Sequence, residues 1–200
     1  MKDLLGSLAI VLSCSGGAWA QDAEPVSQLV PVAEGEQALM QSLVLDAPVD
    51  EVWSRFTTSE GAASWMAPVA EVDLRSGGTI STNYNACATT QDSGTITLDI
   101  VNLVPERFLI LQTDLSASSD AAWMNEAILE RSPDMANLIE FEALGEGQTR
   151  VTSWGLGYGT GEEWEQVIGF FIAGNEWSFG QLIRALDGEQ VWPACEASAN

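Results

Sequence analysis

The central part of the chain alternates hydrophobic and polar residues, which is the pattern of β-strands with one buried face. The segments with this period of two are 71–75, 80–85, 95–100 and 137–144. Further strands are expected at 38–45, 108–113 and 148–156, the last with an ambiguous buried face because Trp154 lies opposite Val151. Glycine-containing turns at 76–79 and 145–147 separate neighbouring segments, as they do in β-hairpins.

Two short helices are expected before the alternating segments, and a third interrupts them. Pro48 suits the first position of a helix, and Asp50 and Glu51 suit its first turn. Ser59 is the expected N-cap of a second short helix that ends near Trp65. Residues 120–131 favour a helix and form a lid-like insertion.

The longest predicted element is a C-terminal helix of about 26 residues, which would extend about 40 Å. Thr160 and Glu163 have the spacing of a capping box, and Gly188 follows the last turn. Only a broad, curved sheet could bury one face of such a helix. Internal glycines cost about 1 kcal/mol each relative to alanine, so Gly169, Gly174 and Gly180 predict close approach by the sheet or a ligand, or a kink near Gly174.

The N-terminus has the layout of a secretory signal peptide over residues 1–20. Lys2 is followed by an apolar stretch to Leu12, and a small-residue site at Ala18-Trp19-Ala20 predicts cleavage after Ala20. The alternative is a lipoprotein signal in which Cys14 is acylated. Both place the protein outside the cytoplasm, in the periplasm or secreted. Residues 21–37 carry two prolines and no periodicity, and are expected to form an extended leader.

Composition excludes several classes of function. The chain has 29 acidic residues against 7 Lys and Arg and no His, for a net charge of −22. Signal cleavage removes one base and one acid, Lys2 and Asp3, so this charge is unchanged. Such a surface disfavours nucleic acids and anionic membranes. The acids are dispersed, which indicates a solvated acidic surface; the alternative is a docking face for a basic partner.

Most catalytic and metal-binding motifs are also absent. Without histidine there is no Ser-His-Asp triad or imidazole metal site, and Lys2 is the only lysine. The glycines at 155–161 miss the phosphate-loop spacing because Thr160 stands where glycine is needed. No calcium loop is present, so we expect no metal and no cofactor.

Export would allow the two remaining cysteines, Cys87 and Cys195, to form a disulfide. This bond would attach the C-terminal tail, residues 189–200, to the sheet. The alternative is two unrelated buried thiols.

Several motifs in this order resemble those of SRPBCC proteins of the Hsp90-ATPase-activator-homologue (AHSA1-like) type. The similarity covers about residues 38–188, which we take as one domain. The matching segments are Ala47–Trp53, Trp65, Val104–Leu109, Gly147–Thr152, Gly157–Trp164, Gly174–Trp177 and Leu182.

The resemblance implies an α+β helix-grip fold, in which a curved antiparallel sheet wraps a long C-terminal helix around an internal cavity. Relatives bind apolar small molecules there, and a minority carry out chemistry. The activator's stimulation of a cytosolic chaperone ATPase would not transfer to an exported protein.

The expected cavity residues come from four parts of the chain. Trp65 and Met66 would lie at the mouth, and Asn175 interrupts the apolar stripe of the long helix, where a buried amide needs a hydrogen-bonding partner. That partner is a neighbouring backbone group, a ligand or water. The remaining candidates are Tyr84, Leu98 and Phe141 from the sheet, Trp123 from the insertion, and Phe171 and Phe179 from the helix.

Three functions follow from this site. The first is an exported protein that binds an apolar or amphipathic small molecule without chemistry. The second is an enzyme of hydrolase or cyclase type that uses the same cavity, with Tyr84 or a buried carboxylate as acid or base. The third is an envelope protein-interaction module with a filled interior and an exposed apolar patch. Oligomeric state is left open.

Overall fold

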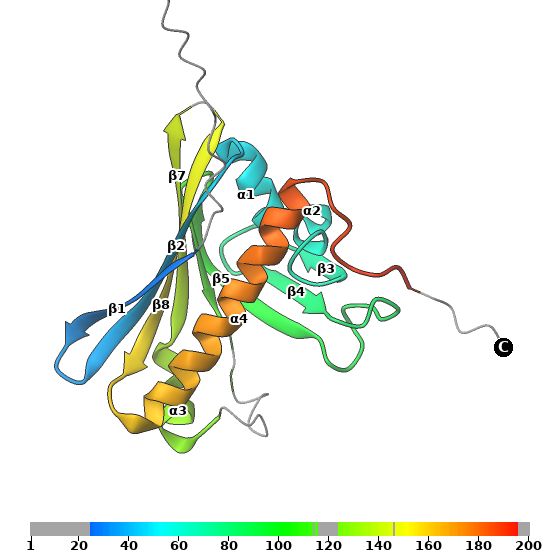
Figure 1. Cartoon of the computed structure of the whole chain (residues 1–200). Coiled ribbons are helices and arrows are strands. Elements are labelled where there is room, and N and C mark those ends of the chain that lie inside the picture. The colour runs from blue at the N-terminus through cyan, green and yellow to red at the C-terminus, as the bar shows by residue number, and fades with distance from the viewer. Residues whose placement is uncertain (1–24, 114, 116–123, 146, 196–200) are drawn as a thin grey trace, which may run out of the picture.

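Eight antiparallel strands form one sheet that curves around a long C-terminal helix (Figure 1). The structure is a computed structural model that describes residues 25–113, 115, 124–145 and 147–195. The strand order is β1-β2-β8-β7-β6-β5-β4-β3. The strands are β1 (Val26–Ala33), β2 (Glu36–Leu45), β3 (Val69–Val72), β4 (Thr79–Asn83), β5 (Ile96–Val104), β6 (Phe108–Gln112), β7 (Ala136–Gly145) and β8 (Gln148–Gly159).

The helices lie at the ends of the sheet and across its inner face (Figure 1). They are α1 (Val49–Thr57), α2 (Ser59–Ala63), α3 (Glu126–Arg131), the 3-10 helix η2 (Ser132–Asp134) and α4 (Glu162–Leu186). The short helices α1 and α2 lie near the C-terminal end of α4, and α3 lies near its N-terminal end. The predicted α+β helix-grip fold is therefore confirmed.

Helix α4 is buried at its two ends and only partly covered in its middle. Its buried residues are Trp164, Val167, Ile168, Phe179, Leu182 and Ala185. The first three pack into a cluster with Leu39, Met135 and Tyr158. The last three pack into a second, larger cluster that includes Phe56, Trp65 and Phe141. Between Ile168 and Phe179 no residue of α4 is fully buried. The helix is therefore packed at both ends, and the space between its middle and the sheet is incompletely filled.

Two predicted helix caps are wrong. Thr58, not Ser59, caps α2: its hydroxyl accepts from the Gly61 amide at 2.9 Å. Ser59 instead accepts a hydrogen bond from the Val72 amide at 3.0 Å. Helix α4 begins after Gly161, whose φ is 109°, and no side chain caps it, so Thr160 does not form the expected capping box.

The predicted faces of three strands also need correction. Leu74 and Tyr84 lie beyond the ends of β3 and β4 and are 40% and 53% exposed. Asn83, expected on the polar face, is buried because its amide donates to Ser93 O and to Thr95 Oγ1, at 3.3 and 3.1 Å. Ala143, expected to face inward on β7, is exposed.

Strand β8 resolves the ambiguity between Trp154 and Val151. Thr149, Val151 and Ser153 are buried, whereas Trp154 lies on the other face and donates to the Glu140 carboxylate at 2.7 Å. The inner face of β8 therefore carries small and polar side chains.

The segment expected as an extended leader contributes strand β1, which pairs with β2 along the edge of the sheet. The chain turns between them at Gly35, which has a positive φ of 72°. Pro31 is compatible with this position because an edge strand tolerates a missing amide proton.

The disulfide Cys87–Cys195 is present and joins residues 108 positions apart. Its Cys87 half lies in the connection between β4 and β5. The tail that it holds packs Trp192 against Tyr84 and Trp177, with ring centroids 5.9 and 5.8 Å apart.

The glycines of α4 are not sites of close approach within the described protein. A Cβ added at Gly169, Gly174 or Gly180 would meet nothing within 4 Å, so the expected contact between sheet and helix backbone is wrong. The helix also continues through Gly174 as a single element.

We therefore expect Gly169→Ala and Gly174→Ala each to raise the free energy of unfolding by about 0.5–1 kcal/mol, because alanine restricts the unfolded chain without a clash. Gly188→Ala is the matched control: its φ of 80° should make the substitution destabilising by about 1 kcal/mol. Chemical denaturation of the three variants measures both effects, and a destabilised Gly169→Ala protein would contradict the open geometry.

Candidate functional site

A cavity of two chambers lies between the sheet and the partly covered middle of α4. The chamber next to Tyr84, here the Tyr84 chamber, has a volume of about 210 Å³ and is also lined by Trp65, Met66 and Phe179. The Tyr158 chamber has a volume of about 170 Å³ and is also lined by Met135 and Phe171. Four residues line both chambers and form a shared waist: Leu98, Leu111, Asn137 and Asn175.

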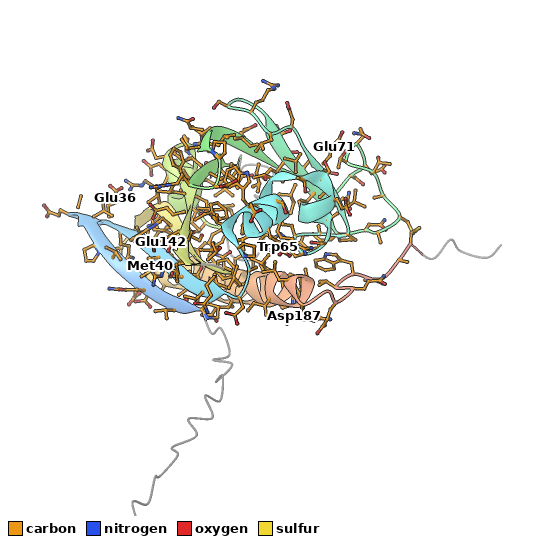
Figure 2. The ribbon with its side chains drawn as sticks, turned by 90° about the horizontal axis from the view of Figure 1, so that it is seen from above. Glu36, Met40, Trp65, Glu71, Glu142 and Asp187 are labelled. Atoms are coloured by element: carbon orange, nitrogen blue, oxygen red, sulfur yellow. A yellow bond between two sulfur atoms is a disulfide. The ribbon has the colours of Figure 1, made fainter. Side chains whose placement is uncertain are left out.

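The lining of both chambers is uncharged. Among the described residues, it combines aliphatic and aromatic side chains with hydroxyl and amide groups and contains no Asp, Glu, Arg or Lys. In the view from above, the labelled Glu36 and Glu71 lie toward different sides of the molecule (Figure 2). The chambers are therefore suited to neutral molecules, since an unpaired charge there would lose its hydration.

Most of the predicted cavity residues come together at these chambers. Trp65, Met66, Tyr84 and Phe179 line the first chamber, Phe171 lines the second, and Leu98 and Asn175 line both. Phe141 lines neither: it is 3% exposed, with ring centroids 5.1 Å from both Trp53 and Phe56. Trp123 lies outside the described residues.

Trp65 is held firmly in the wall of its chamber. Its Nε1 donates to the Arg55 carbonyl at 2.8 Å, and its ring lies 4.8 Å from that of Phe56. Seen from above, Trp65 lies between the short helices and α4, on the inner side of the sheet (Figure 2). The indole is therefore part of the rigid framework of the cavity.

The two tyrosines of the chambers, Tyr84 and Tyr158, differ in exposure but have the same protonation state. Tyr84 is half-exposed and Tyr158 is buried. Burial raises the pKa of both hydroxyls above the ordinary value of tyrosine. Both are therefore protonated at neutral pH and can act as hydrogen-bond donors.

A chain of hydrogen bonds connects the waist to the surface. Asn175 Nδ2 donates to Gln41 Oε1 at 2.7 Å. Gln41, which is fully buried, donates through Nε2 to Ser27 Oγ at 3.0 Å and to the Ile172 carbonyl at 3.4 Å. Ser27 Oγ donates in turn to the Glu176 carboxylate at 3.0 Å. The chain links β1, β2 and α4. The partner of the Asn175 NH2 group is therefore a side chain on a distant strand, not the neighbouring backbone group, ligand or water expected from the sequence.

The sheet contributes a second amide at the waist. Asn137 on β7 accepts a hydrogen bond from Ser153 Oγ on β8 at 3.0 Å. The sequence analysis missed Asn137, although it follows the same alternation as the buried residues Ile139 and Phe141. It also missed Gln41, Ser153 and Tyr158, because polar side chains in a strand are normally expected to face solvent.

The sequence profile described as Activator of Hsp90 ATPase homolog 1-like protein matches residues 46–187. The chain belongs to this family. The match covers α1 through α4 and therefore all four waist residues. No curated protein matches the chain.

Solved structures share the fold of this AHSA1-like protein at low sequence identity. CalU16 from Micromonospora echinospora is 21% identical, with a TM-score of 0.56 over 84% of this chain and 86% of the other. The Aha1 dimer from Colwellia psychrerythraea is 16% identical, with a TM-score of 0.51 over 76% and 95%. A conserved protein of unknown function from Enterococcus faecalis is 12% identical, with a TM-score of 0.55 over 80% and 76%. These similarities concern the fold alone.

A wider depression of about 600 Å³ borders the outward-facing side of β7 and β8 in this AHSA1-like protein. Its walls include Arg107, Arg150, Glu140 and Glu142, and Arg150 forms an ion pair with Glu142. Its lining also includes Val49 and Phe141, but the surface is more polar than apolar, unlike most small-molecule pockets. The two chambers are therefore the better candidate site.

We expect Gln41→Leu to lower the free energy of unfolding by about 1–3 kcal/mol, because it leaves the Asn175 amide without its acceptor. Gln28→Leu, on the exposed face of the neighbouring strand, is the control and should change stability by less than about 0.5 kcal/mol. Urea denaturation compares the two. Equal stabilities would show that the buried hydrogen-bond chain does not support the fold.

Proposed function

We propose that this AHSA1-like protein is exported and binds a neutral apolar or amphipathic small molecule in the two-chambered cavity, without chemical conversion. The observation that carries the proposal is the uncharged space between the two packed ends of α4. Ligand pockets are mostly apolar, with a few polar groups, and typically measure about 300–1,000 Å³. The two adjoining chambers, about 210 and 170 Å³, share four lining residues, and their volumes together reach the lower part of that range.

The chemistry of the lining favours binding over a hydrolase or cyclase reaction. General acid–base catalysis needs a side chain that can take up and release a proton near the working pH. No carboxylate of the described residues lines either chamber, and the raised pKa values of Tyr84 and Tyr158 oppose their use as bases. The tyrosine hydroxyls suit hydrogen bonding to a bound molecule.

The interaction-module alternative finds support in exposed hydrophobic side chains. Val26, Leu29 and Val32 are exposed on the edge strand β1. Phe170 and Trp177 lie seven positions apart on α4 and are each about half exposed, as residues of an interface would be. That alternative expected a filled interior, however, and the two chambers oppose it. Binding inside the cavity is the better supported function.

Two observations support export. The pattern of residues 1–20 is that of a signal peptide, and disulfides such as Cys87–Cys195 persist mainly in oxidising compartments. Within the described residues, no helix is both long and apolar enough to cross a membrane.

The neutral fluorophore N-phenyl-1-naphthylamine tests the binding proposal. We expect saturable uptake by the purified protein, with loss of at least tenfold in affinity in Leu98→Trp, since a larger side chain at the waist occupies both chambers. Val101→Trp is the matched control, because Val101 lies on the same strand and is 48% exposed. Circular dichroism of both variants establishes that they remain folded.

Absence of uptake by the wild-type protein would refute cavity binding. Equal affinities of the folded Leu98→Trp and Val101→Trp proteins would place the fluorophore on the surface instead. Mass spectrometry of small molecules extracted from protein purified from its native compartment would then identify the natural ligand where binding is observed.

Export has its own test. When the full chain is expressed in a bacterial host, we expect the periplasmic product to begin at Gln21 and to lack free thiols. Ala20→Arg should block processing, whereas Cys14→Ser should leave it unchanged. A lipid-modified product starting at Cys14 would support the lipoprotein alternative, and an unprocessed cytoplasmic product with free thiols would contradict export.

A further inference from the structure

At the waist between the chambers, the hydrogen bonds fix which side-chain groups donate and which accept. These roles identify the kind of ligand group that the waist binds. We infer that the ligand carries a hydroxyl or amide N–H between two apolar groups, each about the size of one six-membered ring, and that Asn175 Oδ1 accepts its hydrogen bond. This inference rests on the proposed function and adds the chemical class of the ligand.

The direction of these hydrogen bonds is set at the surface by the Glu176 carboxylate. An ionised carboxylate can only accept hydrogen bonds, so the proton of the Ser27 hydroxyl points to Glu176, at an Oγ–Oε1 distance of 3.0 Å. The Ser27 oxygen must then accept from its other neighbour, Gln41, at 3.0 Å. The Gln41 group that faces Ser27 is therefore its NH2.

The same direction continues to the cavity. The Gln41 NH2 group also donates to the Ile172 carbonyl, which cannot donate, so the amide orientation of Gln41 is determined twice. Gln41 Oε1 consequently faces Asn175 and must receive a donor, the Asn175 NH2, at 2.7 Å. This leaves Asn175 Oδ1 as an acceptor, for which the described residues supply no hydrogen-bond donor.

Asn137 complements this acceptor from the opposite wall. Its Oδ1 accepts from Ser153, which leaves its Nδ2 as a donor. A ligand hydroxyl at the waist can accept from Asn137 and donate to Asn175, whereas a ketone can only accept. The distinction between these two groups therefore depends on Asn175.

The chamber volumes set the size of the two apolar groups. A dry protein cavity of about 150 Å³ accommodates benzene, and the chambers measure about 170 and 210 Å³. Each therefore accepts one ring-sized group, with the waist residues Leu98 and Leu111 between them.

The test uses three probes with the same two phenyl rings: diphenylmethanol, benzophenone and diphenylmethane. Wild-type protein should bind diphenylmethanol about three- to tenfold more tightly than benzophenone, the effect of one net hydrogen bond. In Asn175→Leu the ratio of the affinities for diphenylmethanol and benzophenone should fall to about one. Comparing the ratio in the two proteins cancels differences in the hydration of the probes.

Ser178→Ala is the matched control. Ser178 lies one turn further along α4 and lines the Tyr84 chamber, but its hydroxyl donates to the Gly174 carbonyl. It should retain the wild-type preference. If Asn175→Leu does not fold, the double variant Gln41→Leu/Asn175→Leu removes both buried amides and leaves neither unpaired.

The outcomes separate the two proposals. Binding of no probe by wild-type protein refutes the cavity-binding function itself. Binding of all three with an equal or stronger preference for benzophenone overturns the assignment of Asn175, as does an unchanged preference in the folded Asn175 variant. Loss of the preference in that variant alone supports it.

Discussion

The attachment of α4 at both of its ends is the constraint on which the rest of the structure depends. Trp164, Val167 and Ile168 fix one end, and Phe179, Leu182 and Ala185 fix the other. The middle of the helix cannot settle onto the sheet without unpacking one of these clusters. The cavity is therefore a consequence of packing elsewhere, and its position is set by the distance between the two clusters along the helix.

The separation of charge from the cavity follows from the same arrangement. Helix α4 covers much of the inner face of the sheet, so a carboxylate there would lose part of its hydration, which is costly for a charged group. The acidic residues of β7, Glu140 and Glu142, instead alternate with the buried Ile139 and Phe141 and point outward. A chain with a net charge of −22 thus has chambers whose described polar lining consists of amides and hydroxyls.

The order of the elements and much of the cavity wall could be predicted from the sequence, because strand and helix periodicity determine which residues share a face. The disulfide was also predicted correctly. The sequence predicts only an extended segment where β1 lies, since prolines interrupt its pattern and pairing with β2 cannot be inferred from composition. Strand alternation places Asn83 on the wrong face because partners in the following loop satisfy its amide. The partner of Asn175 lies on a distant strand. The periodicity of one strand or helix does not show which residues of another element it contacts.

The position of β8 in the sheet determines when the domain can be completed. Strand β2 pairs with β1 on one side and β8 on the other, so its second edge has no neighbour until β8, near the end of the chain, joins the sheet. Contacts between segments so far apart in sequence slow folding, and an unpaired strand edge promotes association between chains. Chains of high like charge repel one another, so a net charge of −22 opposes such association before the sheet is complete.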